Sequence, residues 1–137
     1  ILAALAESAA MRLTYEPAPD VAQLLSRIIE KLNLSHIQLE RLCCFRSHGS
    51  TTRYVVARVH ALPRIWQQAL GIKAHYAIEV LAEKYDPLSV DEKERILIHE
   101  LLHIPKSFGG GFRHHRGWVT KRRIESLHRT LRESSEN

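Results

Sequence analysis

Cysteine is scarce in this chain of 137 residues, and no long apolar run is present. The two cysteines, Cys43 and Cys44, are adjacent, and neighbouring residues form an ordinary disulfide only with strain. They also lack the C-x-x-C spacing of metal and redox sites, so we expect two small apolar residues in a strand. A disulfide-rich secreted fold is thereby excluded, and a reducing cytoplasm is the expected setting. No apolar stretch reaches the ~18–20 residues that span a bilayer, which excludes a membrane helix.

An initiator methionine is missing as well, because the chain begins at Ile1 and its single methionine is Met11. The apolar opening is short, lacks a basic segment and runs into Glu7, unlike a signal peptide. We therefore expect the natural start at or near Met11, with residues 1–10 derived from upstream sequence. The prediction is an N-terminal extension over residues 1–14 and one domain over residues 15–137, with 45% apolar residues supplying a modest core.

Acidic residues are outnumbered, 15 against 20 basic ones, which gives a net charge of +5. Many basic residues gather beyond residue 112, namely Arg113, Arg116, Lys121, Arg122, Arg123, Arg129 and Arg132. Such a surface on a C-terminal helix would suit DNA phosphates. The alternative is a solvated helix face, because Glu125 and Glu133 dilute the patch. No zinc-ribbon cysteines or other DNA-binding module accompanies it, so DNA association is a hypothesis.

The most informative segment is the H-E-x-x-H motif that runs from His99 to His103. On a helix, residues four apart lie on one face about one turn apart, so both imidazoles reach one metal ion. Glu100 lies about 100° further round the helix, where a carboxylate can orient and deprotonate a metal-bound water. This is the arrangement of zinc metalloproteases. The alternative is a pair of core histidines beside an unrelated glutamate.

The surrounding sequence predicts a buried helix for this motif. Ser89 and Glu92 fit the S-x-x-E capping box, and the acidic residues of the first turn complement the helix dipole. Between residues 96 and 102 only the histidine and the glutamate of the motif are polar, and Pro105 ends the helix just beyond it. Polar groups on so apolar a helix need partners or a function.

A catalytic zinc site has three protein ligands and one open position. Downstream of the motif, the glycine run 109–111 allows the chain to turn back over the metal, and His114 and His115 follow at the start of the next helical segment. Either histidine can supply the third ligand, and the spacing does not choose between them. The metzincin spacing is excluded, because it requires a histidine where Gly109 stands. Residues 104–124 contain no Cys, Asp or Glu that would compete.

The segment from Ile98 to His115 resembles the signature of a family of small metallopeptidases found in archaea and phages, which are single-domain, SprT-like zincins. That signature runs H-E-L-L-H-I-P, a short glycine-containing loop, an arginine, one further residue and a ligand histidine. Residues 15–20, 57–60 and 76–80 are similar to its other recurrent stretches, so the resemblance covers roughly residues 15–131. An acidic residue often follows the last histidine in the family, whereas Arg116 stands here.

The resemblance implies a zinc-dependent endopeptidase. It assigns His99, His103 and His115 as Zn²⁺ ligands and Glu100 as the general base, while His114 falls at a position that is usually not a ligand. Zinc would lower the pKa of a bound water towards ~7, and the glutamate would take its proton and return it to the leaving amine. The implied substrate is a protein or peptide. SprT-like proteases that cleave proteins crosslinked to DNA extend this expectation to DNA-associated proteins.

The rest of the chain predicts a minimal zincin-like α+β fold, in which a small mixed sheet and supporting helices hold the buried metal helix. We expect a helix capped by Asp20, strands over residues 36–46 and 52–59 joined by a hairpin turn, a short helix over 63–70, and a strand over 74–81. The first helix should bury Val21, Leu24, Leu25, Ile28, Ile29 and Leu32. A last helix from about residue 116 should carry Thr120, Ile124, Leu127 and Leu131 on one face.

In zincins the strand before the metal helix commonly lies at the edge of the cleft. Residues 74–81 are therefore predicted to pair with substrate backbone, with a plain sheet strand as the alternative. The donor that stabilises the oxyanion is not identifiable among Arg113, His114, Tyr76 and His60. The remaining histidines, His36, His48, His75 and His128, are expected on the surface or in the scaffold. A zinc-dependent hydrolase of nucleic acid and a non-catalytic zinc- or nucleic-acid-binding module are the alternative functions.

Overall fold

The computed structural model describes residues 13–136. Residues 1–12 of the predicted extension, Met11 among them, lie outside the described residues, so the position of the natural start stays a prediction. The first described element is strand β1 (Thr14–Pro17), which begins one residue before the predicted start of the domain. This strand was not predicted from the sequence.

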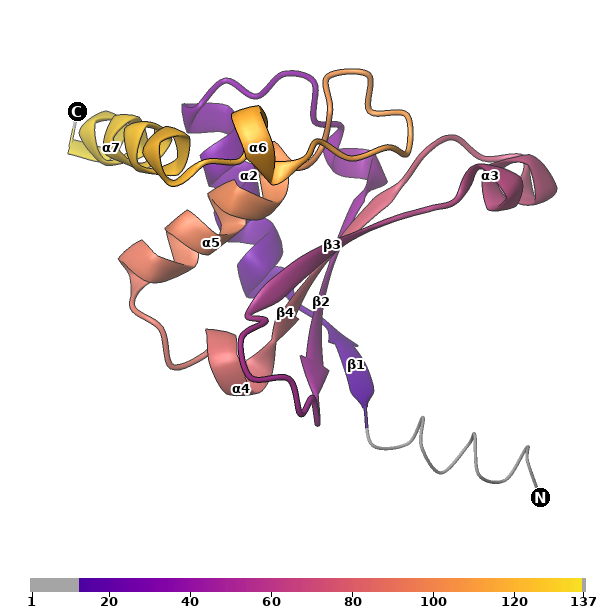
Figure 1. Ribbon diagram of the computed structural model, residues 1–137, viewed down its shortest axis with the longest axis horizontal. Coiled ribbons are helices and arrows are strands. Elements are labelled where there is room, and N and C mark those ends of the chain that lie inside the picture. Colours follow the sequence, from indigo (N-terminus) through magenta and orange to yellow (C-terminus); the bar gives the residue numbers. More distant parts are fainter. Residues whose placement is uncertain (1–12, 137) are drawn as a thin grey trace.

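Four strands form one mixed sheet in the order β1-β2-β4-β3 (Figure 1). The other three strands are β2 (Leu42–His48), β3 (Ala57–Ala61) and β4 (Tyr76–Leu81). β2 and β4 run parallel, with Cys44 opposite Ile78, whereas β1 pairs with β2 and β3 pairs with β4 in antiparallel fashion. The helices α2 (Pro19–Lys31) and α5 (Val90–Leu102) pack on one side of this sheet (Figure 1). The predicted α+β fold with a small mixed sheet is confirmed.

The remaining elements are short except for the last. They are η1 (Leu39–Arg41), α3 (Arg64–Leu70), α4 (Ala82–Tyr85), α6 (His115–Trp118) and α7 (Lys121–Glu136). The predicted helix over residues 63–70 is confirmed as α3: Pro63 is its N-cap, and Gly71 ends it with a φ of 65°.

The predicted hairpin between residues 36–46 and 52–59 is wrong. η1 takes up the first part of the predicted strand, so β2 starts at Leu42, and β2 does not pair with β3. β4 lies between them and pairs with both. Most β4 side chains are buried, and a strand buried on both faces is stable in the interior of a sheet. A hairpin of β2 and β3 would have left this strand at an edge.

α2 buries the predicted stripe. Val21, Leu25, Ile28 and Ile29 are buried, and Leu24 and Leu32 pack partly buried against the same core. The start of the helix differs from the prediction, because Ala18 is the N-cap and Pro19 occupies the first turn. Asp20 does not cap the helix: its carboxylate accepts hydrogen bonds from the Arg46 guanidinium at 3.0 and 2.7 Å, which ties α2 to β2.

α5 begins and ends as predicted. The Ser89 hydroxyl accepts from the Glu92 backbone N–H at 3.2 Å, and the Glu92 carboxylate accepts from the Ser89 N–H at 3.3 Å. The last helical residue is Leu102, and His103 is the C-cap just before Pro105. Leu97, Ile98, Leu101 and Leu102 of α5 are buried in the core.

A buried ionic network fixes α5 to its neighbours. Glu94 of α5 is 2% exposed and accepts a hydrogen bond from Arg27 of α2 at 2.7 Å. His128 of α7 donates to the same carboxylate from Nε2 at 3.1 Å. A buried carboxylate with two such donors is charge-compensated, so α5 has a defined position between α2 and α7.

The predicted last helix is interrupted. Gly117 has a φ of 84° and breaks the helical backbone inside α6, Val119 is the non-helical C-cap, and α7 starts at Lys121. Thr120 lies before α7, where its hydroxyl accepts from the Arg123 N–H at 3.2 Å, so it caps the helix instead of lying on the buried face. The rest of the predicted face is confirmed, since Leu131 is buried and Ile124 and Leu127 pack against the core.

Within residues 13–136, none of the helices is both long and apolar enough to cross a membrane.

Candidate metal centre

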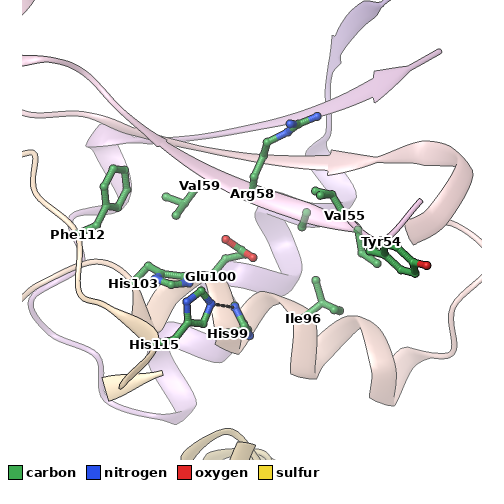
Figure 2. Close-up of a pocket in the computed structure, with 12 residues that line it drawn as sticks. Tyr54, Val55, Arg58, Val59, Ile96, His99, Glu100, His103, Phe112 and His115 are labelled. Carbon is green, nitrogen blue, oxygen red and sulfur yellow. Dashed lines mark hydrogen bonds between the residues drawn. The ribbon is translucent and has the colours of Figure 1, made fainter. Parts of the chain in front are cut away.

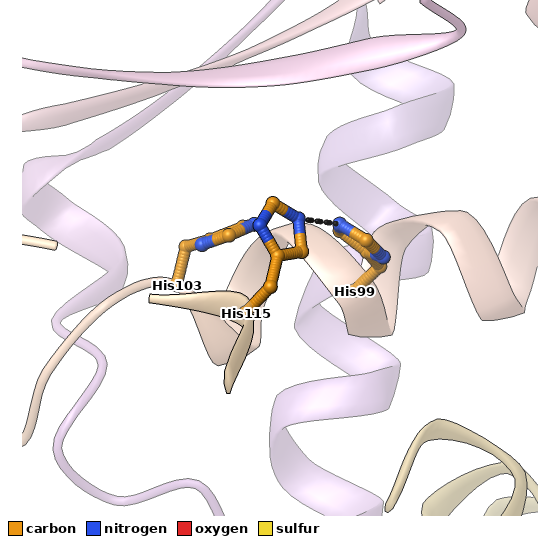
Figure 3. A group of neighbouring side chains, drawn as sticks. All are labelled: His99, His103 and His115. Atoms are coloured by element: carbon orange, nitrogen blue, oxygen red, sulfur yellow. Dashed lines mark hydrogen bonds between the residues drawn. The ribbon is translucent and has the colours of Figure 1, made fainter. Parts of the chain in front are cut away.

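Three histidines converge at the C-terminal end of α5 (Figure 3). His99 lies on the helix, His103 is its C-cap, and His115 opens α6. The ring centroids are 4.5 to 5.2 Å apart, and one ligand atom from each ring lies within 4.8 Å of the other two. The structure thus brings together the three histidines that the resemblance assigned. His114 is the exposed N-cap of α6 and lies outside this cluster.

The spacing of the imidazoles suits a tetrahedral ion. Two nitrogens that each lie ~2.0–2.1 Å from Zn²⁺ in a tetrahedral site are about 3.3 Å apart. His99 Nε2 and His115 Nε2 are 3.2 Å apart. Three imidazole donors suit zinc and other first-row transition metals, whereas Mg²⁺ and Ca²⁺ take oxygen ligands. The residues present therefore fit a zinc ion with one position left for a further ligand.

The main chain of Arg113 orients His103. His103 Nδ1 lies 2.8 Å from the carbonyl oxygen of Arg113, and the Arg113 N–H donates to the His103 carbonyl at 2.7 Å. Because a carbonyl oxygen only accepts, Nδ1 carries the proton, and Nε2 has its lone pair free to face the cluster. Arg113 stands at the arginine position of the family signature, and it contacts His103 through its main chain.

The glycine run is held by Tyr76 of β4. The Tyr76 hydroxyl donates to the Gly111 carbonyl at 2.8 Å and accepts from the Gly110 N–H at 2.9 Å. Gly110 has a φ of 106°, and a Cβ there would lie 2.9 Å from the side-chain amide nitrogen of Gln67. The positive φ confirms that glycine is favoured where the chain turns back from α5 towards His115, whereas the end of the flexible Gln67 side chain can move aside.

Substituting Tyr76 by Phe is expected to lower the affinity for zinc about tenfold and to lower Tm. The substitution leaves the Gly110 N–H and the Gly111 carbonyl without their partner, in a loop that carries a predicted ligand. Isothermal titration with Zn²⁺ and a thermal melt measure the two effects. Tyr85→Phe is the matched control, because Tyr85 is equally buried but its hydroxyl makes no hydrogen bond to the described residues. Equal effects of both substitutions would contradict a role for the Tyr76 hydroxyl.

Glu100 is 8% exposed and points from α5 towards β3 (Figure 2). Burial raises the pKa of Glu100 to about 7, although the main chain of Val59 acts in the opposite direction. Burial and the neighbouring imidazoles of His103 and His115 lower the pKa of His99 to about 4. His99 is therefore neutral at pH 7, as a metal ligand must be. A carboxyl group whose pKa lies near 7 can both accept and release a proton at neutral pH, so Glu100 beside this cluster suits proton transfer.

An open cavity of about 580 Å³ lies over the three histidines and Glu100 (Figure 2). Its opposite wall is formed by residues 54–59, which end in β3, and Phe112 lies at its border. The sequence did not identify these residues as part of the site. The strand-like run over residues 52–59 predicted a strand, but no local signal shows which strand of a sheet lies against a given helix.

The predicted cleft edge at residues 74–81 is wrong. β4 is paired on both sides, with β2 and with β3, so its backbone is not available to a substrate. β3 is the last strand of the sheet and pairs only with β4 among the described residues, and it lines the cavity. Order along the chain misled the prediction because long-range pairing decides which strand is outermost.

No candidate oxyanion donor from the sequence lines the cavity; these candidates were Arg113, His114, Tyr76 and His60. The Arg113 guanidinium stacks on Trp118 at 4.6 Å. The ring of His60 contacts the Glu79 carboxylate at 2.8 Å, and both hydrogen bonds of the Tyr76 hydroxyl go to the glycine run. His114 is exposed. In the described structure these four side chains thus lie outside the cavity, three of them with other partners.

The other histidines have scaffold partners, as expected. His36 contacts the Ile104 carbonyl, His48 the Glu16 carboxylate, His75 the Lys73 carbonyl and His128 the Glu94 carboxylate. Asp91, Glu94 and His128 form a second cluster of ligand-type side chains. Arg132 pairs with Asp91 and Arg27 pairs with Glu94. Two guanidinium groups thus neutralise these carboxylates, and the cluster is an ion-pair network between helices.

Residues 13–130 match the model of a protein family described as "Putative phage metallopeptidase". The chain belongs to this family. The match extends from the start of the sheet through most of α7 and includes the three converging histidines and Glu100. No curated protein and no solved structure matches the chain. Membership of a metallopeptidase family indicates a metal-dependent peptidase that acts on proteins or peptides, and the family description does not name the ion.

Proposed function

We propose that the protein is a zinc-dependent endopeptidase in which His99, His103 and His115 hold the ion and Glu100 is the general base. The observation that carries the proposal is the convergence of three imidazoles, with ligand atoms within 4.8 Å of one another, beside a buried carboxylate in an open cavity. Family membership supports the peptidase class. We further propose a likeness to SprT-like zincins, which the signature between Ile98 and His115 supports.

Zn²⁺, when bound, supplies a Lewis acid that polarises the scissile carbonyl and increases the acidity of water. Glu100 takes a proton from the attacking water and passes it to the nitrogen of the leaving amine. Its position between α5 and β3 places the carboxylate inside the cavity, next to the imidazole cluster. Arg113 keeps His103 in the tautomer that a ligand needs, because its carbonyl accepts the Nδ1 proton.

We propose that the substrate backbone pairs with the free edge of β3. An extended peptide that adds to a strand edge gains main-chain hydrogen bonds without needing a particular side chain. β3 has this edge, and Val59 of β3 lies in the same cavity as Glu100. Tyr54 and Phe112 also line the cavity and are 89% and 46% exposed. They offer apolar contacts to substrate side chains.

Removal of the metal tests this function. The purified protein is expected to bind about one Zn²⁺ per chain and to cleave denatured casein. A chelator should reduce cleavage to background, and Zn²⁺ but not Mg²⁺ should restore it, since the donors are nitrogen atoms. Failure to bind zinc would contradict the site. Bound zinc with no cleavage of casein, RNA or a protein–DNA mixture would favour a non-catalytic module, and zinc-dependent cleavage of RNA would favour a nuclease.

We also propose that the protein associates with DNA and works in the cytoplasm. The first turn of α7 contains Lys121, Arg122 and Arg123 and no acidic residue, which supports attraction of nucleic acid phosphates. Action on DNA-associated proteins would use this basic turn to bring the substrate to the cavity. Cys43 and Cys44 are free thiols, which agrees with a reducing environment. Titration of the protein with a single-stranded oligonucleotide tests the DNA part: affinity that does not fall with rising salt or with Arg122→Gln would contradict it.

A further inference from the structure

A second pocket lies between α5, α7 and the turn that follows α2. It has a volume of about 340 Å³ and shares no lining residue with the cavity of the metal centre. Apolar side chains of α5 and α7 form part of its wall. Its polar lining consists of Asn33, Ser35, His36, Lys106, Arg113 and Arg123, and no carboxylate is among the lining residues. The pocket therefore concentrates positive charge without an internal counter-ion.

Like several other arginines among the described residues, the cations of this pocket have no carboxylate partner. Elsewhere Arg27, Arg46, Arg58, Arg95 and Arg132 each form an ion pair with a carboxylate. Among residues 13–136, none of the ion pairs involves Lys106, Arg113 or Arg123. Like charges around one pocket repel each other, and an anion between them would remove this repulsion.

The lowered pKa of His36 and the start of α7 both indicate a positive field at this pocket. Arg113 is partly buried, and its side chain stacks on Trp118 while its main chain is bonded to His103. His36 contacts the Ile104 carbonyl at 3.3 Å, and burial, Arg113 and Lys106 all lower its pKa, which shows that both cations act on this ring. Arg123 lies in the first turn of α7, at the positive end of the helix dipole, where acidic residues are normally favoured and none is present.

We propose that this pocket is a binding site for a phosphate group. A phosphate presents several acceptor oxygens and a negative charge, which match the two guanidinium groups and the ammonium group of the lining. Asn33 and Ser35 add neutral hydrogen-bond donors. The phosphate comes either from a free anion or phosphomonoester, or from the backbone of a nucleic acid. The site stands apart from peptide hydrolysis and does not depend on it.

Titration of the zinc-loaded protein with sodium phosphate at constant ionic strength, followed by ¹H–¹⁵N NMR, tests the site. Binding should shift the amide signals of residues 33–36 and 123–127. Arg123→Gln should weaken binding roughly tenfold, the effect of losing one charge-assisted hydrogen bond. Arg129→Gln is the matched control, because it removes the same charge from an exposed position of the same helix without touching the pocket or the first turn of α7. It should change the affinity less than about twofold.

Three results would overturn the proposal. They are the absence of shifts, equal weakening by the two substitutions, and shifts confined to residues 99–103 and 115, which would mean that phosphate binds the metal. A second arm adds a short single-stranded oligonucleotide to the phosphate-bound protein. Displacement of phosphate from residues 33–36 and 123–127 would identify a backbone phosphate as the ligand. Retention of phosphate in the pocket would identify the free anion or monoester. Either outcome of the second arm supports a phosphate site.

Discussion

Glu100→Gln is expected to keep Zn²⁺ bound and to lower kcat/KM for casein-derived peptides by about 10²–10⁴. Glutamine has the shape of glutamate but cannot accept the proton of the attacking water at neutral pH. The three imidazoles do not depend on this carboxylate: Arg113 orients His103, and within residues 13–136 no hydrogen bond joins Glu100 to a histidine ring. Metal content by mass spectrometry and peptide hydrolysis by fluorescence measure the two properties on the same sample.

Glu92→Gln is the matched control for this substitution. Glu92 lies on the same helix, and glutamine also serves at this position of a capping box. The control should keep both zinc and activity. If Glu100→Gln retains more than about a tenth of the activity, Glu100 is not the general base. If it loses zinc together with activity, the carboxylate has a structural role in the metal site.

The metal-free form of Glu100→Gln provides a check of its folding. The pKa of Glu100 is about 7 in the folded protein, against an ordinary value of 4.5 for an exposed glutamate, so the folded state binds more protons between these pH values. The metal-free wild type therefore loses stability as pH rises from 4.5 to 7. Glutamine has no such titration, so at pH 8 the variant should be more stable than the wild type by about 1–3 kcal/mol. Urea unfolding at pH 5 and pH 8 measures this difference.

His115→Ala is expected to lower the affinity for Zn²⁺ by at least about 100-fold and to abolish hydrolysis. Loss of a group that merely orients a ligand costs 10–100-fold in affinity, and loss of a ligand costs more. His115 belongs to the converging cluster, with its Nε2 3.2 Å from that of His99. The remaining two imidazoles would leave the ion with two open positions. Competition with a fluorescent chelator gives the affinity.

His114→Ala is the control for this experiment. The two histidines are adjacent and exposed, yet only His115 lies in the cluster. His114→Ala should keep zinc and activity within about threefold of the wild type. Loss of zinc in His114→Ala with retention in His115→Ala would reverse the assignment of the third ligand. Loss in neither variant would show that the metal does not need a third histidine.

The candidate site could be predicted largely from the sequence because its main parts are local. The distance between His99 and His103 follows from the rise and turn of a helix, and Ser89 and Pro105 mark where that helix begins and ends. The glycine run predicted the turn that returns the chain to the metal helix, and the positive φ of Gly110 explains why glycine is favoured there. The family signature was needed to choose His115 over His114, because the two adjacent histidines are almost equally far along the chain from His103.

The sheet was harder to predict because pairing between strands is not local. The turn at residues 47–50 resembles a hairpin, yet β2 and β3 are separated by β4. β4 was placed at the cleft edge by its position before the metal helix, whereas its buried side chains place it inside the sheet. Gly117 likewise interrupted the predicted last helix, because its left-handed backbone breaks the helical turn before α7 begins.

By itself the sequence determined the metal helix, its two histidines and glutamate, the buried stripe of α2 and the α+β class. These features depend on helical periodicity, capping and backbone sterics, which act over a few residues. Only the tertiary structure decided that β3 borders the cavity, that Tyr76 and Arg113 hold the ligand loop, and that Lys106, Arg113 and Arg123 meet His36 in a second pocket. The residues of each group lie far apart in the chain, and their meeting results from burial of the whole core, which no short segment encodes.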